Sequence, residues 1–175
     1  MNQLSAQAAA VPRQIPAAGA IQDNDPLTAV EADLLEPIAH HRRIVVGLDG
    51  SEASVSAMRR AVIIATALGA PVEAVCSWRM PTGYATLGAF EYSPEDDAHA
   101  MLSGAVKSVF GTKVPDWFTT ATFEGAAADV LIEQSVGAQM LVIGSRGHGG
   151  IAGLLLGSVS ARCAERASCP VLIVH

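Results

Sequence analysis

Residues 140–160 read MLVIGSRGHGGIAGLLLGSVS, and six of the fifteen residues from 144 to 158 are glycine. The stretch begins with a short apolar run, Met140 to Ile143, and ends in a segment of helical character that starts at Ser158. Glycine weakens regular structure, so a cluster of this kind indicates strained turns or a close approach of the backbone to another group. The pattern predicts a buried strand, a glycine-rich loop and a helix in succession.

The same alternation of strand and helix extends back from this stretch to residue 41 and forward to the C-terminus. Apolar, β-branched runs bounded by turn residues predict strands, and apolar residues at helical spacing between cap residues predict helices. The expected strands lie at 44–46, 71–78, 117–123, 140–143 and 171–174, and the expected helices at 52–68, 94–110, 126–135 and 158–167. This βαβαβαβαβ order predicts an α/β fold, a single domain whose open parallel sheet of five strands carries helices on both faces.

Residues 1–40 are predicted to form a largely disordered N-terminal tail, which leaves 41–175 as the folded domain. Residues 1–24 are rich in Ala, Gln and Pro and show no periodicity. The segment 26–36 follows a helix-capping residue, Asp25, and is ended by Pro37. Two interpretations of this segment stay open: a short docking helix, and a transient helix within the tail.

The composition favours a packed domain and argues against several classes of partner. Half of the residues are hydrophobic, 16% are charged, and the net charge is -6. No basic face is available for nucleic acid, and the apolar runs are too short to span a membrane. The three cysteines lack C-x-x-C or zinc-ligand spacing, so we expect reduced thiols in a cytoplasmic protein and no metal site.

Two loops at the ends of strands are candidates for a ligand site. Ligands of open parallel sheets bind beyond the carboxyl ends of the strands, where the strand order reverses. Leu48 and Asp49 follow the first strand, and the glycine stretch follows the fourth strand at Ile143. Glycines would let the backbone lie against a phosphate, and the helix that begins at Ser158 would offer free N–H groups. The residues suggest a cradle for a nucleotide, in which Asp49 accepts hydrogen bonds from a sugar or a base.

Each of these features also has a structural interpretation that stays open. A glycine-rich segment after a strand can be no more than a tight loop, and Asp49 can be a helix-capping residue. Arg146 and His148 can contact phosphates or face the solvent. Trp78 and Cys76 are expected to pack in the core.

Taken together, the residues resemble the universal stress protein family over nearly all of 41–175. The spaced pattern G-x2-G-x9-G-[S/T] matches at Gly144, Gly147, Gly157 and Ser158. The first-strand sequence IVVGLDGSEAS and the closing CPVLIV also match.

The resemblance implies strand order 3-2-1-4-5, a homodimer formed through the last strand, Val171 to Val174, and a protein partner that it does not identify. It also implies that the domain binds ATP, with or without Mg²⁺, and it implies no catalytic residue. The nucleotide-binding residues that it implies are Leu48, Asp49, Ser77, Ile143, Gly144, Arg146, Gly147, Gly157, Ser158, Val159 and Ser160.

Two functions compete for such a domain. The first is a nucleotide-dependent regulatory protein of the stress response with little or no hydrolysis. The second is a nucleotide α-hydrolase-type enzyme, either a slow ATPase or an adenylating enzyme. That class would need a loop rich in glycine and serine after the first strand, where GLDGSEAS offers one Gly-Ser pair. A P-loop enzyme is excluded because the sequence lacks G-x-x-x-x-G-K-[ST], and a flavodoxin-like carrier is disfavoured because the glycines follow the fourth strand.

Overall fold

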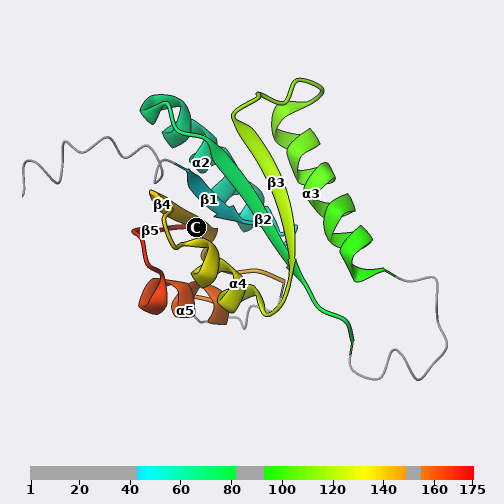
Figure 1. The fold of residues 1–175 in the computed structure, drawn as a ribbon, viewed down its shortest axis with the longest axis vertical. Coiled ribbons are helices and arrows are strands. Elements are labelled where there is room, and N and C mark those ends of the chain that lie inside the picture. The colour runs from blue at the N-terminus through cyan, green and yellow to red at the C-terminus, as the bar shows by residue number, and fades with distance from the viewer. Residues whose placement is uncertain (1–42, 82–92, 149–154) are drawn as a thin grey trace, which may run out of the picture. The chain divides into compact units, whose positions relative to one another are not determined.

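The computed structural model describes residues 43–81, 93–148 and 155–175. Five strands form one parallel sheet in the order β3-β2-β1-β4-β5 (Figure 1). The strands are β1 (Ile44–Gly47), β2 (Val72–Trp78), β3 (Phe118–Glu124), β4 (Met140–Gly144) and β5 (Val171–Val174). The helices are α2 (Glu52–Leu68), α3 (Pro94–Phe110), α4 (Ala127–Gln134) and α5 (Ser158–Arg166). The predicted fold class and strand order are confirmed, and each predicted element is present to within about two residues of its expected bounds.

Three parts of the sequence prediction lie outside the described residues. They are the tail at 1–40 with its candidate helix at 26–36, the larger part of the loop between β2 and α3, and residues 149–154 of the glycine stretch.

The sheet is buried on both faces because its central strand, β1, carries apolar side chains at every position before its final glycine. In β1, Ile44 and Val46 belong to a core cluster that includes buried residues of α2 and α3. Val45 points the other way, into a second cluster formed with α4 and α5. All three side chains are fully buried. Two helices therefore cover each face, which is why the strand reads as a continuous apolar run.

The four helices begin in two different ways. Ser51 caps α2 by accepting a hydrogen bond from the N–H of Ser54 at 3.2 Å, and Ser93 caps α3 in the same way from Asp96 at 3.1 Å. Within the described residues, α4 and α5 start after Ala126 and Gly157 without any side-chain cap. The N–H groups of their first turns are left for another partner, because a helix cannot satisfy them internally.

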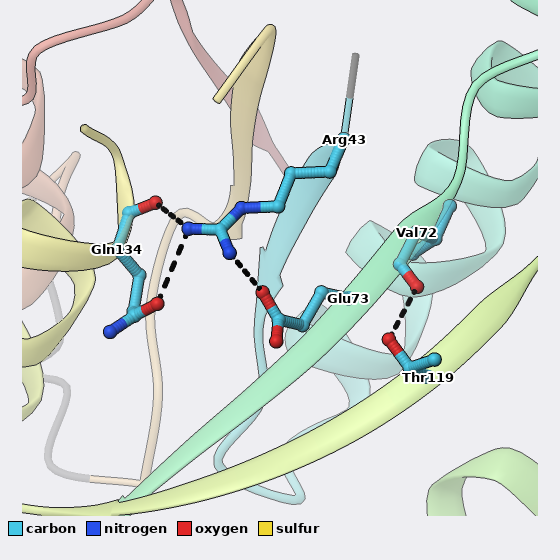
Figure 2. Close-up of polar contacts among 5 residues, drawn as sticks. All are labelled: Arg43, Val72, Glu73, Thr119 and Gln134. Atoms are coloured by element: carbon cyan, nitrogen blue, oxygen red, sulfur yellow. Dashed lines mark hydrogen bonds and ion pairs between the residues drawn. The ribbon is translucent and has the colours of Figure 1, made fainter. Parts of the chain in front are cut away.

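A polar cluster joins β1, β2 and α4 at the edge of the sheet where the parallel strands begin (Figure 2). Arg43 lies just before β1, and its guanidinium is 2.8 Å from the carboxylate of Glu73 at the start of β2. The same guanidinium donates to the backbone carbonyl of Gln134, the last residue of α4, at 3.0 Å. Beside it, the Thr119 hydroxyl donates to the Val72 carbonyl at 3.4 Å across β2 and β3. These contacts leave the opposite edge, at the carboxyl ends of the strands, for the candidate site.

Candidate functional site

A cavity of about 420 Å³ lies at the carboxyl ends of the central strands. All eleven residues that the sequence analysis placed at a nucleotide site line this cavity: Leu48, Asp49, Ser77, Ile143, Gly144, Arg146, Gly147, Gly157, Ser158, Val159 and Ser160. The structure thus brings together loops that are far apart in the sequence, because β1 and β4 are neighbours in the sheet. That these residues contact a nucleotide stays a prediction.

The loop after β1 presents the carboxylate of Asp49 to the cavity. One oxygen, Oδ1, accepts hydrogen bonds from the Ser51 backbone N–H at 3.0 Å and from the Ser51 hydroxyl at 2.6 Å. Partial burial works to raise the pKa of Asp49, but these hydrogen bonds outweigh it and hold that pKa below the ordinary value of 3.8. The carboxylate is therefore ionised at neutral pH. Ser51 is the cap of α2, so the helix-capping interpretation of Asp49 is wrong.

Gly144, the last residue of β4, and Gly147, in the loop after it, are needed for close approach of other atoms and not for a left-handed backbone, since neither has a positive φ. A Cβ on Gly144 would lie 2.9 Å from the backbone carbonyl carbon of Ala53 and 3.0 Å from the Ser54 nitrogen. Gly144 therefore allows the start of α2 to pack directly on the end of β4. A Cβ on Gly147 would overlap Oδ2 of Asp49, so the two loops touch at this point.

The two ends of the glycine loop are held together at Ser145. Its backbone carbonyl accepts a hydrogen bond from the Gly157 N–H and another from the Ser160 hydroxyl, both at 2.8 Å. The Ser145 N–H in turn donates to the carbonyl of Val174 in β5 at 2.7 Å. Because the hydroxyl of buried Ser160 is engaged with the backbone, its own N–H is the group left to offer a ligand.

The first turn of α5 supplies the strongest feature for an anion. Ser158 is exposed and Val159 half-buried, and both line the cavity together with Ser160. The preceding residue, Gly157, adopts extended backbone and provides no side-chain cap. Uncapped N–H groups at a helix N-terminus bind phosphates through hydrogen bonds and through the positive end of the helix dipole.

The other part of the cavity is apolar. Val75 from β2, Leu131 from α4 and Ile143 from β4 line it, and all three are buried among the residues of one core cluster. Ser77, at the end of β2, borders this part. An apolar slot of this kind suits the flat face of a base.

Part of this lining was not predicted from the sequence. The residues missed were Gly47, Ser54, Val75, Ala127, Leu131 and Leu156. Val75 and Leu131 read only as core residues. The signal that could have identified Ala127 is the sequence Gly125-Ala126-Ala127, a helix start after a strand without any capping side chain.

Two basic side chains lie at the rim of the cavity. Arg146 and His148 are exposed, and both line it. The Nε2 atom of His148 lies 3.6 Å from the position that a Cβ on Gly50 would occupy, so its ring reaches from the loop after β4 to the loop after β1. The structure places both side chains where either a phosphate or solvent can meet them, and both interpretations stay open.

The thiols offer no nucleophile to this site. Burial raises the pKa of Cys76 to about 11, and burial likewise raises the pKa of Cys163 to about 11. Cys76 lies in the core as expected, and all three cysteines are free. The described residues contain no cluster of three or more His, Cys, Asp or Glu side chains placed to hold a metal ion.

Comparison with known proteins assigns the chain to a family. The profile of the universal stress protein family matches residues 40–175. The chain therefore belongs to the universal stress protein family, as the glycine pattern and the strand sequences predicted.

Several curated relatives carry the same family name. A universal stress protein of Mycolicibacterium smegmatis is 33% identical over 153 residues, which is 86% of this chain and 51% of that protein. One of Mycobacterium bovis is 30% identical over 82% of this chain and 48% of its own length. One of Methanocaldococcus jannaschii is 30% identical over 77% of this chain and 82% of its own length. The chain thus spans about half the length of the mycobacterial relatives.

Solved structures share the fold. A universal stress protein crystallised in complex with cAMP is 31% identical, with a TM-score of 0.59 over 78% of this chain and 98% of that one. UspA of Lactobacillus plantarum, at 20% identity, gives a TM-score of 0.64 over 78% of this chain and 99% of that one. A protein of Archaeoglobus fulgidus in complex with dAMP is 23% identical, with a TM-score of 0.53 over 78% and 99% of the two chains.

No helix in the described part of the chain combines the length and the apolar character needed to cross a membrane.

Proposed function

We propose that this chain is an ATP-binding universal stress protein domain that acts as a nucleotide-dependent regulator of the stress response. The observation that carries the proposal is the uncapped N-terminus of α5, which opens into a cavity with an apolar slot on another side. The uncapped helix N-terminus suits phosphates and the apolar slot suits a base, so the cavity matches both halves of a nucleotide.

The parts of the ligand are assigned by chemistry. The base occupies the slot between Val75, Leu131 and Ile143, with Ser77 at its border. The sugar lies where Asp49 and Gly147 meet, because an ionised carboxylate accepts hydrogen bonds from sugar hydroxyls.

The N–H groups of Ser158, Val159 and Ser160 donate hydrogen bonds to the phosphates. Gly157, which has no side chain, leaves room for the phosphates. Asp49 is the one carboxylate among the described residues around the cavity, and Ser51 already engages its Oδ1 atom. A magnesium ion, where present, would therefore be held chiefly by the phosphates.

The relative of 31% identity that was crystallised with cAMP supports an adenine nucleotide as the ligand. In the proposal, residues 41–175 form the working domain and 1–40 a tail. The domain forms a homodimer through β5, since an edge strand with four half-buried apolar residues is one that soluble proteins cover. The three free thiols fit the cytoplasm, and the protein partner is one that reads the nucleotide-bound surface.

Calorimetric titration of the full chain with ATP tests the proposal. We expect saturable binding of one ATP per chain. Mass spectrometry of the ligands released by denaturing the purified protein provides a second measurement, in which ATP or AMP is the expected result. The absence of any saturable heat with ATP and with AMP, together with a flavin among the released ligands, would contradict the proposal.

A further inference from the structure

His148 occupies a position at the cavity that the family pattern does not explain. It follows Gly147 directly and lines the cavity, yet it is not one of the glycine or serine positions of the pattern. Its Nε2 atom lies close to Gly50, 3.6 Å from where a Cβ would be. The ring therefore sits next to Asp49, at the junction of the two loops where the sugar is proposed to lie.

The charged residues that line the cavity with this ring are Asp49 from the loop after β1 and Arg146 from its own loop. From α3 the neighbour at the Gly50 turn is Met101, which carries no charge. Burial raises the pKa of Asp49, whereas the serine hydrogen bonds and, as the smallest contribution, the nearby His148 ring lower it. No ion pair within 4 Å joins His148 to Asp49 in the described part of the chain. The ring is thus free to donate to another anion.

We propose that protonated His148 donates a hydrogen bond to the phosphate nearest the sugar of the bound nucleotide, so that nucleotide affinity rises as the pH falls through the histidine range. This inference rests on the proposed function. Histidine has an ordinary pKa of about 6.5, so its charge changes within the range that cells experience. A phosphate near the ring favours the protonated form, and binding therefore takes up protons near neutral pH.

The direction of the effect follows from the charges that do not change. An arginine such as Arg146 keeps its positive charge at every relevant pH. Asp49 stays ionised over the same range, because its lowered pKa lies well below that range. Among the described residues that line the cavity, the other basic side chain is His148. A neutral imidazole can donate one ordinary hydrogen bond, whereas an imidazolium donates a charge-assisted one, a difference of about fivefold in affinity.

The test is calorimetric titration of the full chain with ATP and with AMP at about pH 5.5 and pH 8. The ligand's own phosphate also titrates in this range, at about pH 6, so each measurement is compared with the same one on His148→Gln. For each ligand, the ratio of the affinity at pH 5.5 to the affinity at pH 8 should be about fivefold larger in the wild type than in His148→Gln. At pH 8, where the ligand is in the same ionisation state for both proteins, His148→Arg should bind about fivefold more tightly than the wild type. His99→Gln, on the exposed face of α3, is the matched control and should behave as the wild type.

Proton uptake gives an independent measurement. Near pH 6.5 the binding enthalpy of the wild type should depend on the ionisation enthalpy of the buffer more strongly than that of His148→Gln. Equal pH dependence in the wild type and His148→Gln would overturn the inference while leaving nucleotide binding intact. A difference confined to ATP would overturn the assignment to the phosphate nearest the sugar. If the wild type bound neither ATP nor AMP at either pH, that result would instead contradict the proposed function.

Discussion

The carboxylate of Asp49 lies against the backbone of Gly147, so closely that a Cβ on the glycine would overlap Oδ2. The two residues follow different strands, β1 and β4, which are neighbours because the sheet order places them side by side. Their contact joins the loop proposed to hold the sugar to the loop that leads toward the phosphates. A substitution at either residue should therefore alter the position of the other.

Replacing Gly147 with alanine should weaken ATP binding by about 1–3 kcal/mol, because the new methyl group displaces the carboxylate from the sugar position. The stability of the fold should change little, since the atom that must move is the end of a flexible side chain. Calorimetric titration measures the first effect and thermal melting the second. Gly104→Ala is the matched control, because it lies in α3 with open space around it and should gain up to about 1 kcal/mol of stability without changing affinity. Equal ATP affinity in Gly147→Ala and the wild type would show that this contact does not position the ligand.

Asp49→Asn should lose ATP affinity while the protein stays folded, because α2 is capped by Ser51. Its acid sensitivity should also change. The pKa of Asp49 is lowered in the folded state, so the group stabilises the protein above pH 3.8 and loses this contribution as the pH falls through its folded pKa. The asparagine variant should therefore show a smaller drop in the free energy of unfolding on acidification below about pH 4. Unfolding of Asp49→Asn at neutral pH, seen by circular dichroism, would mean that the residue is structural.

Ile173→Lys should convert the proposed dimer into a monomer by placing a charge in the edge strand β5. Ile173 also packs against the core cluster that contains Leu141, so the charge will lower stability as well. Phe123→Lys separates the two effects, because Phe123 packs against the same cluster but lies in β3, at the opposite edge of the sheet. Sedimentation should give a monomer for Ile173→Lys and a dimer for Phe123→Lys. A dimer of unchanged strength for Ile173→Lys would move the interface away from β5.

ATP hydrolysis should be absent or far slower than the ~10 s⁻¹ that is typical of enzymes. The groups at α5 bind phosphates in the ground state, and binding the ground and transition states equally does not accelerate a reaction. The buried thiols, with pKa values of about 11, are protonated at neutral pH and cannot act as nucleophiles. Phosphate release under steady-state conditions checks this expectation. Turnover of several per second that Arg146→Ala abolishes would restore the enzyme interpretation.

Much of the fold was predictable because the signals were local. The β-branched run of β1, the serine caps of α2 and α3, and the alternation of strands with helices specify a parallel α/β sheet. The strand order came from the resemblance to a family and not from these signals. The glycines at the site were also visible, but the physical role of each was not. Whether Gly144 meets a phosphate or the backbone of Ala53 depends on how α2 packs on β4, which no local pattern contains.

The apolar lining was hidden for a related reason. Val75 and Leu131 have the sequence signature of core residues, and they are core residues, with one side turned to the cavity. The resemblance placed Ser160 at the nucleotide site, and in the fold its hydroxyl joins the two ends of the loop at Ser145. Only the tertiary contacts distinguish a side chain that faces a ligand from one that supports the loop.

The most direct test of the proposed nucleotide site is the ATP affinity of Gly157→Ala, measured by calorimetry beside Gly144→Ala. A Cβ on Gly157 would make only ordinary contacts, at 3.5 Å or more, and its backbone is extended, so this variant should fold as the wild type does. Gly144→Ala should instead lose stability, because its methyl group meets the backbone of α2 at 2.9 Å. If phosphates lie on the first turn of α5, Gly157→Ala should keep its melting temperature and lose at least about tenfold in ATP affinity, or about 1.4 kcal/mol. A stable Gly157→Ala that binds ATP as tightly as the wild type would contradict the account.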